Sequence, residues 1–412
     1  MGAAPIASRR AMMGRPTGHA DPRSSMQLEL SAEDAAFREE MRTFFTTQVP
    51  QEIRDAVASR RELSKEMWVQ SQRILNAAGL AVPNWPVEWG GRDWTPLQRH
   101  IWHEEMQRAC VPPPLAFNAT MVGPVIATFG SQEQKERFLP PTANLDIWWS
   151  QGFSEPDAGS DLASLRTSAV LDGDTWVVNG QKTWTTLGQY GDWIFCLVRT
   201  DPDAPKKQLG ISFLLIDMTT PGVTVRPIQL IDGGHEVNEV WFEDVRVPAE
   251  NLVGEVNKGW SYAKFLLGNE RVGVAPVGST KRVLWQAKEW ARKVGVLEDP
   301  LVAAQFADLE NELLALELTA LRVVAHSSDG KPHPASSVLK LKGTVLQQAV
   351  SELVVDIAGP ASLATGATDD QSDVDDWARV ATPSYLNLRK ASIYGGSNEI
   401  QRQIIAGTIL GL

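Results

Sequence analysis

Hydrophobic residues recur every three or four positions over two long parts of the chain, and this periodicity predicts amphipathic helices. Near the start, an apolar stripe through Phe37 and Phe44 follows Ser31, a residue suited to cap a helix. From Lys258 to the end the helical period returns, most clearly in "QFADLENELLALELTALRVVAH" and "KLKGTVLQQAVSELVVDIAG". We therefore expect helices at both ends of the chain.

The middle of the chain has a different pattern, with short runs of β-branched and aromatic residues bounded by turn residues. Examples are "TWVVNGQKTW", "GISFLLIDM" and "NEVWFEDVRV". Asn179-Gly180 favours a tight hairpin turn. The patterns together predict an α+β protein. Its expected parts are an N-terminal extension at 1–25, a helical domain at 26–145, an antiparallel β domain at 146–257 and a C-terminal helical bundle at 258–412.

Composition narrows the classes of partner and compartment. The net charge of −11 argues against a broad nucleic-acid surface, and no apolar run has the length of a membrane span. The two cysteines, Cys110 and Cys196, cannot form a disulfide framework, so we expect a cytoplasmic protein. Residues 1–25 carry four arginines and no apolar segment of secretory-signal length. We expect a disordered tail or an over-long start there, with a targeting peptide as the alternative.

One stretch with the composition of a ligand loop is "QGFSEPDAGSDLASLRT" at 151–167. Glycine lets backbone N–H groups approach a ligand closely, and Ser160 next to Gly159 adds a hydroxyl group. Such a loop can hold a pyrophosphate or a carbonyl. An ordinary connection between strands is the alternative.

Two further stretches suit a flat ligand with an anionic part. In "NGQKTWTT", Trp184 can stack on a ring while Thr185 and Thr186 bind its edge, unless they belong to an ordinary packed strand. In "YGGSNEIQRQIIAGTILGL", Ser397 can cap a helix whose free N–H groups attract anions, unless the glycines only form a kink. The sequence has no metal-binding, Walker, Rossmann or nucleophile-elbow motif.

Taken together and in this order, four stretches resemble the acyl-CoA dehydrogenase family, over the chain from about residue 27: "FSEPDAGSD", "NGQKTWTT", "FEDVRVPAENLVGE" and "IYGGSNEIQRQIIAGTILGL". The resemblance implies an N-terminal helical domain, a middle β domain and a C-terminal four-helix bundle. It also implies FAD, α,β-dehydrogenation of an acyl-CoA to the trans-2-enoyl-CoA in β-oxidation, a tetramer, and an electron-transfer flavoprotein as acceptor. The positions that match flavin contacts are Phe153, Ser154, Gly159, Ser160, Trp184, Thr185, Thr186, Ser397 and Glu399.

Within that family, "GISFLLID" and "IDGGHEVNEV" are similar to the large subunit of pimeloyl-CoA dehydrogenase, which acts on dicarboxylyl-CoA thioesters. A dicarboxylyl-CoA is therefore a candidate substrate. The sequence offers no evident partner for a distal carboxylate, so the length of the acyl chain stays open.

The catalytic base is expected in an unusual place. Many relatives hold a glutamate directly after the tyrosine of the C-terminal motif, where this chain has Gly395, whereas others place it before an arginine on the first helix after the β domain. Glu270, followed by Arg271, matches the second pattern and falls on the apolar stripe through Leu266. Desolvation raises the pKa of a carboxylate towards the range in which a base works. We expect Glu270 to be the base, and Arg271 and Ser160 to bind substrate; a buried ion pair is the alternative.

The family's contacts to the adenine half of FAD are altered. The corresponding segments read "ARKVGVLEDP" and "DIAGPASL", without the usual phenylalanine and with Pro360 where a glycine is expected. Because these segments normally reach a neighbouring subunit's flavin, we expect a second subunit of the same fold in a heterotetramer, with a homo-oligomer as the alternative. Two other functions remain open: a flavin monooxygenase or desulfinase on the same scaffold, and a non-catalytic assembly subunit.

Overall fold

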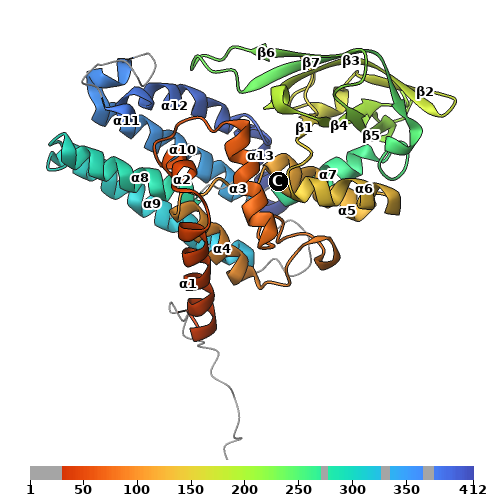
Figure 1. Ribbon diagram of the computed structural model, residues 1–412. Coiled ribbons are helices and arrows are strands. Elements are labelled where there is room, and N and C mark those ends of the chain that lie inside the picture. The colour runs from red at the N-terminus through yellow and green to blue at the C-terminus, as the bar shows by residue number, and fades with distance from the viewer. Residues whose placement is uncertain (1–29, 271–276, 326–334, 365–374) are drawn as a thin grey trace, which may run out of the picture.

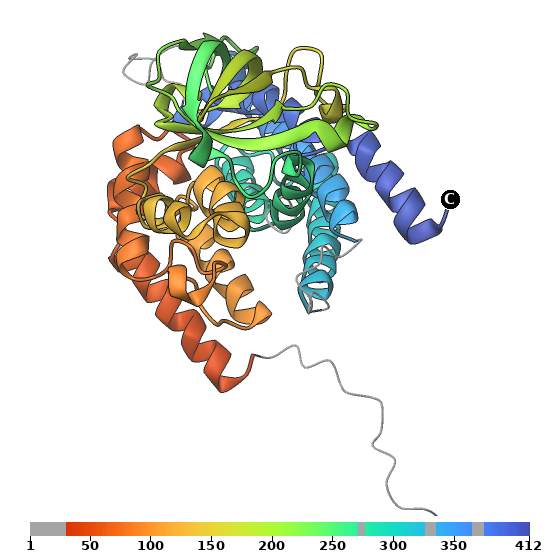
Figure 2. The ribbon, with the colours of Figure 1, turned by 90° about the vertical axis from the view of Figure 1, so that its right-hand side faces the viewer.

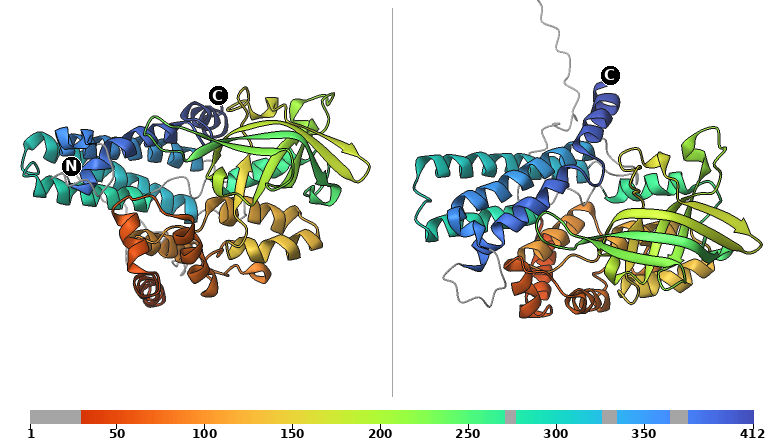
Figure 3. Two further views of the ribbon diagram at one scale, coloured as in Figure 1. Left: turned by 45° about the horizontal axis from the view of Figure 1, so that its top comes forward. Right: turned by 90° about the horizontal axis from the view of Figure 1, so that it is seen from above.

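The chain forms a helical domain, a β domain and a second helical domain in sequence order (Figure 1). The computed structural model describes residues 30–270, 277–325, 335–364 and 375–412. The sheet lies at one end of the molecule and the helices α8 to α12 extend to the other end, as the two views of Figure 3 show. The N-terminal helices lie between and below them.

The N-terminal helices begin where the sequence supplies caps. Their bounds are α1 (Ala32–Thr47), α2 (Gln51–Ala58), α3 (Lys65–Ala77), α4 (Pro96–Arg108), α5 (Gly123–Phe129) and α6 (Gln132–Ala143). The hydroxyl of Ser31 accepts from the backbone N–H of Asp34, as predicted, and satisfies one free donor of the first turn of α1. Thr95 and Ser131 form capping boxes at α4 and α6.

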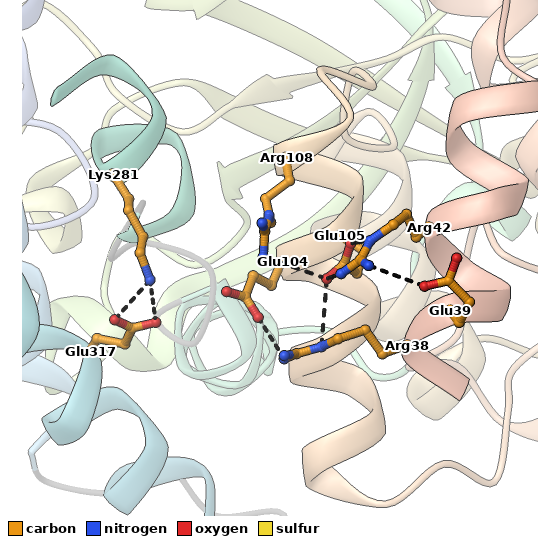
Figure 4. A network of polar contacts seen from close by, with 8 residues as sticks. All are labelled: Arg38, Glu39, Arg42, Glu104, Glu105, Arg108, Lys281 and Glu317. Carbon is orange, nitrogen blue, oxygen red and sulfur yellow. Dashed lines mark hydrogen bonds and ion pairs between the residues drawn. The ribbon is translucent and has the colours of Figure 1, made fainter. Parts of the chain in front are cut away.

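Buried charge joins α1 to α4. The side chain of Glu105 on α4 is 2% exposed and accepts from Arg42 Nε at 3.1 Å and Nη2 at 3.2 Å. Arg38, one helical turn earlier on α1, donates to Glu104 at 2.8 Å (Figure 4). Breaking a buried pair leaves an uncompensated charge, so this network fixes how the two helices pack.

The β domain is one sheet of seven strands. They are β1 (Trp149–Gly152), β2 (Ser168–Asp172), β3 (Thr175–Thr186), β4 (Trp193–Arg199), β5 (Ile211–Asp217), β6 (Val223–Ile228) and β7 (Val237–Pro248). Their order is β1-β4-β2-β3-β7-β6, with β5 on the other side of β4. Most neighbours are antiparallel, as predicted, but β4 runs parallel to β1 and to β2.

The hairpin predicted at Asn179-Gly180 is wrong. Both residues lie inside β3, and the tight turn is at Gly173-Asp174, between β2 and β3. The amide of Asn179 instead pairs across the sheet with Asp244, donating to its carboxylate at 2.9 Å and accepting from its N–H at 2.9 Å. Asp244 is the extra residue of a bulge on β7, so the asparagine and glycine that suggested a turn serve a bulge instead.

A second bulge lies near the end of β3. Three steps along β3, from Lys182 to Thr185, face only two steps along β7, so β3 carries one extra residue there. Trp184 adopts a left-handed backbone with φ of 60° and is 58% exposed. The bulge turns the indole out of the sheet while Thr185 stays buried.

The C-terminal part is a helical bundle. Its elements are α7 (Gly259–Glu270), α8 (Val277–Lys293), α9 (Pro300–Ala325), α10 (Ser336–Ala358), α11 (Asp376–Arg379), α12 (Ala381–Leu388) and α13 (Asn398–Ile405). A core through Leu284, Phe306, Leu316 and Leu353 joins α8, α9 and α10. Beyond α13 the chain projects from the body (Figure 2). None of the helices in the described ranges is long and apolar enough to cross a membrane.

Candidate functional site

The glycine loop after β1 is fastened to β3 by a buried ion pair. Lys182 on β3 is fully buried, and its Nζ donates to Glu155 Oε1 at 2.7 Å and to the carbonyl of Leu197 at 2.7 Å. The other face of the Glu155 carboxylate accepts from the backbone N–H groups of Arg166 and Thr167, at 2.6 and 2.9 Å. The start and the end of the loop are therefore held by one carboxylate.

The charge on Glu155 is stabilised by these partners. Burial alone raises the pKa of the Glu155 carboxyl, but the charge of Lys182 and the hydrogen bonds from Lys182, Thr167 and Arg166 outweigh it, and the pKa lies below its usual value. The carboxylate is thus ionised at neutral pH, and both of its oxygens accept hydrogen bonds.

The tip of the same loop is open to a ligand. Gly159 and Ser160 are exposed, and a Cβ at Gly159 would have no atom of the described residues within 4 Å apart from its chain neighbours. The chain itself therefore does not require glycine at this point, whereas close approach of a phosphate or a ring would. Phe153 is placed differently, because its ring packs edge-on against Phe195 and Phe213 in the core. A flavin contact at Phe153 would have to come from its backbone.

The end of β3 offers a ring and an unused hydrogen-bonding group. Trp184 presents its indole to solvent, and Thr185 Oγ1 is buried with no hydrogen-bond partner in the described chain. A buried hydroxyl group without a hydrogen-bond partner is rare in folded proteins. The exposed indole of Trp184 fits the flat ring of FAD, whereas the hydroxyl of Thr185 is buried on the inward side of the strand.

The C-terminal motif forms a tight turn before α13. Gly395 and Gly396 have φ of 63° and 83°, a backbone region that favours glycine. Ser397 then caps α13, as predicted, by accepting from the N–H of Ile400. The amide of Gln401 donates to the carbonyls of Gly395 and Gly396, at 3.4 and 3.2 Å, and holds the turn against the helix.

A series of hydrogen bonds and one ion pair, called the bridge below, connects the end of β3 to the glycine turn before α13. Leu187, directly after β3, donates its N–H to the carbonyl of Glu236 at 2.7 Å. The carboxylate of Glu236 forms an ion pair with Lys390 and accepts from Asn387 Nδ2 at 3.1 Å. The carbonyl of Lys390 in turn accepts from the N–H of Tyr394 at 3.1 Å. One continuous set of contacts thus runs from the Trp184 strand to the glycine turn.

The predicted site residues are not all joined directly. Among the described residues, no hydrogen bond or ion pair links the 153–160 loop to Ser397 or Glu399. Glu399 is exposed and pairs only weakly with Arg402, at 3.5 Å. Glu270 is the last residue of α7, but its side chain lies outside the described residues, as does all of Arg271.

Sequence reasoning missed the residues that hold the site together. Lys182 had a signal, because a lysine on the inward phase of a buried strand needs a buried partner. Glu236 and Lys390 had no such signal in the sequence, since their ion pair depends on how two domains pack. Among the described residues, no three His, Cys, Asp or Glu side chains gather as metal ligands would.

A helical domain, a sheet and a helical bundle, with an exposed indole on β3 and an open glycine loop after β1, are compatible with a flavin-dependent oxidoreductase. Family profiles for the N-terminal, middle and C-terminal domains of acyl-CoA dehydrogenases match residues 31–146, 150–245 and 257–410. The chain belongs to the acyl-CoA dehydrogenase family.

The chain is similar to named members of that family. Acyl-CoA dehydrogenase IpdE1 of Mycobacterium tuberculosis is 39% identical, over 85% of this chain and 89% of that protein. Long-chain specific acyl-CoA dehydrogenase of Sus scrofa is 28% identical, over 92% and 87%.

Solved structures give the same result. The ChsE4–ChsE5 complex of Mycobacterium tuberculosis has a TM-score of 0.80 and 32% identity, and covers 94% of this chain and 99% of its own. The structure described as the Tcur3481–Tcur3483 steroid ACAD has a TM-score of 0.82 and 30% identity with the same coverage. The protein is thus a flavoprotein that uses FAD to dehydrogenate an acyl-CoA in lipid degradation. The expected likeness to pimeloyl-CoA dehydrogenase is met only at the level of the family.

Proposed function

We propose that Glu270 is the base of this dehydrogenation and removes the α-proton of the acyl-CoA. The observation that carries the proposal is the turn at Gly395: the position that holds the base in many relatives has no carboxylate, and its φ of 63° disfavours one. Glu270 ends α7 one helical turn after Leu266, which is fully buried. The proposed base therefore comes from a helix whose buried residues lie against the β domain and α5.

The other residues of the chain would bind and orient. The 153–160 loop and Ser397 would hold the anionic part of FAD, Trp184, Thr185 and Thr186 would border its ring, and bound FAD would accept the β-hydrogen as hydride. Arg271 and Ser160 would bind the thioester substrate. Charge that develops on the thioester oxygen needs hydrogen-bond donors, as at any oxyanion site. Electrons would leave to an electron-transfer flavoprotein.

Two substrate classes have separate support. The resemblance of "GISFLLID" and "IDGGHEVNEV" favours a dicarboxylyl-CoA. The similar solved structure described as a steroid ACAD favours a CoA thioester with a steroid-derived acyl group. Flavin bleaching by pimeloyl-CoA, and by a steroid side-chain CoA thioester, distinguishes the two.

We further propose a partner chain of the same fold. The altered segments at 291–300 and around Pro360 support it, and the ChsE4–ChsE5 structure is described as a complex. Co-expression with a candidate partner should raise the flavin content and give a mixed tetramer in light scattering. Full flavin content and a homotetramer from this chain alone would contradict it.

Glu270→Gln tests the base, with exposed Glu250→Gln as the matched control. We expect Glu270→Gln to keep its yellow flavin but to lose bleaching by substrate, by roughly 10²-fold or more, because general base catalysis contributes that much. Glu250→Gln should behave as wild type. Normal turnover by Glu270→Gln would show that another group is the base. Oxygen consumption by the wild type with a reductase would instead favour the monooxygenase. Absence of flavin from the purified wild type would favour the assembly subunit.

A further inference from the structure

We propose that Arg60 and Arg282 form a binding site for an oxyanion, a carboxylate or a phosphate group, where α2 meets α8. Arg60 follows the end of α2 in the N-terminal domain, and Arg282 lies in the second turn of α8 in the C-terminal bundle. The site is formed by one cation from each domain. It is separate from the glycine loop, from Trp184 and from the Gly395 turn.

Arg282 and the residues that hold Arg60 lie on one face of α8. Arg282, Gln286 and Trp290 follow each other at intervals of four residues, so they share that face. Gln286 Nε2 donates to the carbonyl of Ala58 at 3.0 Å and docks the end of α2 onto the helix. Arg60 Cζ lies 5.5 Å from the centre of the Trp290 ring, so its guanidinium group is held by a cation–π contact.

The two guanidinium groups on this face lack an ion-pair partner within the described ranges. Arg282 Nε is buried without a hydrogen-bond partner, and neither guanidinium group forms an ion pair or hydrogen bond with a residue of the described chain. The neighbours add positive charge, because Arg61 and Lys281 are also basic. Lys281 is already paired with Glu317 at 2.9 Å (Figure 4). A donor that is buried beside a second cation is a place where an anion is missing.

The backbone conformation of Arg60 also supports an anion site. The N–H of Arg61 donates to the carbonyl of Ala56, and that of Arg60 to Val57, which is the turn that usually ends in glycine. Arg60 has φ of 57° there, although a side chain is disfavoured in that region. Burial, followed by the charge of Arg282, lowers the pKa of Arg60 to about 10. The fold therefore disfavours the charged form of Arg60, and a bound anion would offset this.

Two guanidinium groups select the chemistry of the occupant. Each offers a planar fork of N–H donors that matches carboxylate and phosphate oxygens, and a second fork neutralises the remaining charge. A free inorganic anion and the distal carboxylate of an acyl-CoA share this chemistry. The site therefore predicts an oxyanion, and the experiment must separate these two sources.

The first test measures thermal unfolding of the purified protein in sodium phosphate, in sodium acetate, and in sodium chloride of equal ionic strength. We expect phosphate or acetate to raise the melting temperature of the wild type by roughly 2–4 °C, because an anion that binds only the folded state stabilises it. Arg282→Met should lose this rise and, in chloride, should melt no lower than wild type, since Arg282 makes no bond that the change would break. Arg61→Met, which removes an exposed cation next to the site, should still respond as wild type.

A second variant guards against a misfolded protein. Arg60→Gly suits the left-handed backbone and should also lose the response to phosphate. An equal response to phosphate in the wild type and both variants would overturn the proposal. So would a wild type that ignores every anion while Arg282→Met melts at lower temperature, because Arg282 would then bind a partner subunit instead.

The last arm identifies the source and depends on the proposed function. It compares flavin bleaching by adipoyl-CoA and by hexanoyl-CoA, which differ in the terminal carboxylate. If the anion belongs to the substrate, Arg282→Met should raise KM for adipoyl-CoA alone, by roughly tenfold. If the anion is a free inorganic ion, Arg282→Met should leave both KM values unchanged, while the wild type alone still responds to phosphate. Failure of every thioester to bleach the flavin would contradict the proposed function and leave the phosphate result standing.

Discussion

Two lysine–glutamate pairs support the candidate site, and they differ in their surroundings. Lys182 and Glu155 are 0% and 7% exposed and join two parts of the β domain. Lys390 and Glu236 are 31% and 38% exposed and join the β domain to the C-terminal bundle. The first pair has replaced water with fixed partners on every side, whereas water still competes for the second.

The comparison separates two ways in which a protein positions a site. A buried pair must be complete, because either charge alone would be expensive in the interior. A half-exposed pair contributes little to stability, but it can still determine how two domains are oriented. We therefore expect the first pair to control whether the glycine loop folds, and the second to control how the loop's domain meets the Gly395 turn.

The largest effect is expected for Lys182→Met. It leaves the Glu155 carboxylate buried without its cation, and should lower the free energy of unfolding by about 3–5 kcal/mol. Urea unfolding followed by circular dichroism measures this change. The double variant Lys182→Met/Glu155→Gln should regain part of the loss, because no unpaired charge remains. A loss below about 1 kcal/mol in the single variant would show that the pair behaves like a surface pair.

An intermediate effect is expected from pH. The pKa of Glu155 is below its usual value in the folded state, so the pair stabilises the fold at pH above about 4.3, the usual glutamate value, and this contribution is lost as pH falls through the folded pKa. Glu155→Gln should therefore flatten the acid limb of a plot of stability against pH. In Lys182→Met the buried carboxylate keeps only its backbone N–H donors, and acid should narrow the difference in stability from wild type because protonation removes the unpaired charge. An unchanged acid limb in Glu155→Gln would contradict the assignment.

The smallest effect on stability is expected for Lys390→Met, about 0.2–1 kcal/mol, because both partners are half-exposed. The loss should shrink further in 1 M salt, where exposed charges are screened. The visible circular dichroism of the flavin should nevertheless change, since the bridge orients Leu187 relative to Tyr394. Lys342→Met, which breaks a surface pair between α9 and α10, is the control and should leave the flavin spectrum unchanged. Equal spectra for both variants would mean that the bridge does not position the site.

Local signals in the sequence predicted local structure well. The hydroxyl of Ser31 and that of Ser397 each cap the predicted helix, because a cap depends only on a few adjacent residues. Asn179-Gly180 is ambiguous as a local signal, since the same two residues suit a hairpin turn and a site opposite a bulge. Only the pairing of β3 with β7, over 65 residues from Asn179 to Asp244, decides between them.

The sequence stretches point to single parts of the candidate site but not to the contacts that connect them. The exposed indole of Trp184 and the open tip at Gly159 fit the roles proposed from their sequence stretches. The bridge through Glu236 and Lys390 spans 154 residues and depends on domain packing, which no short motif encodes. The Arg60–Arg282 pair is equally invisible in sequence, because a missing counter-charge can be recognised only when all neighbours are known.

The extra residue near the end of β3 changes which positions of that strand point inward. Before it, inward side chains fall on even numbers, as at Trp176, Val178 and Lys182; after it they fall on odd numbers, as at Thr185. Deleting Thr183 would remove the bulge and restore regular alternation opposite β7, with Trp184 still outward and Thr185 still inward beside Asn238. The deletion would instead abolish the left-handed backbone at Trp184, so the extra residue sets the direction of the indole and not which face it lies on.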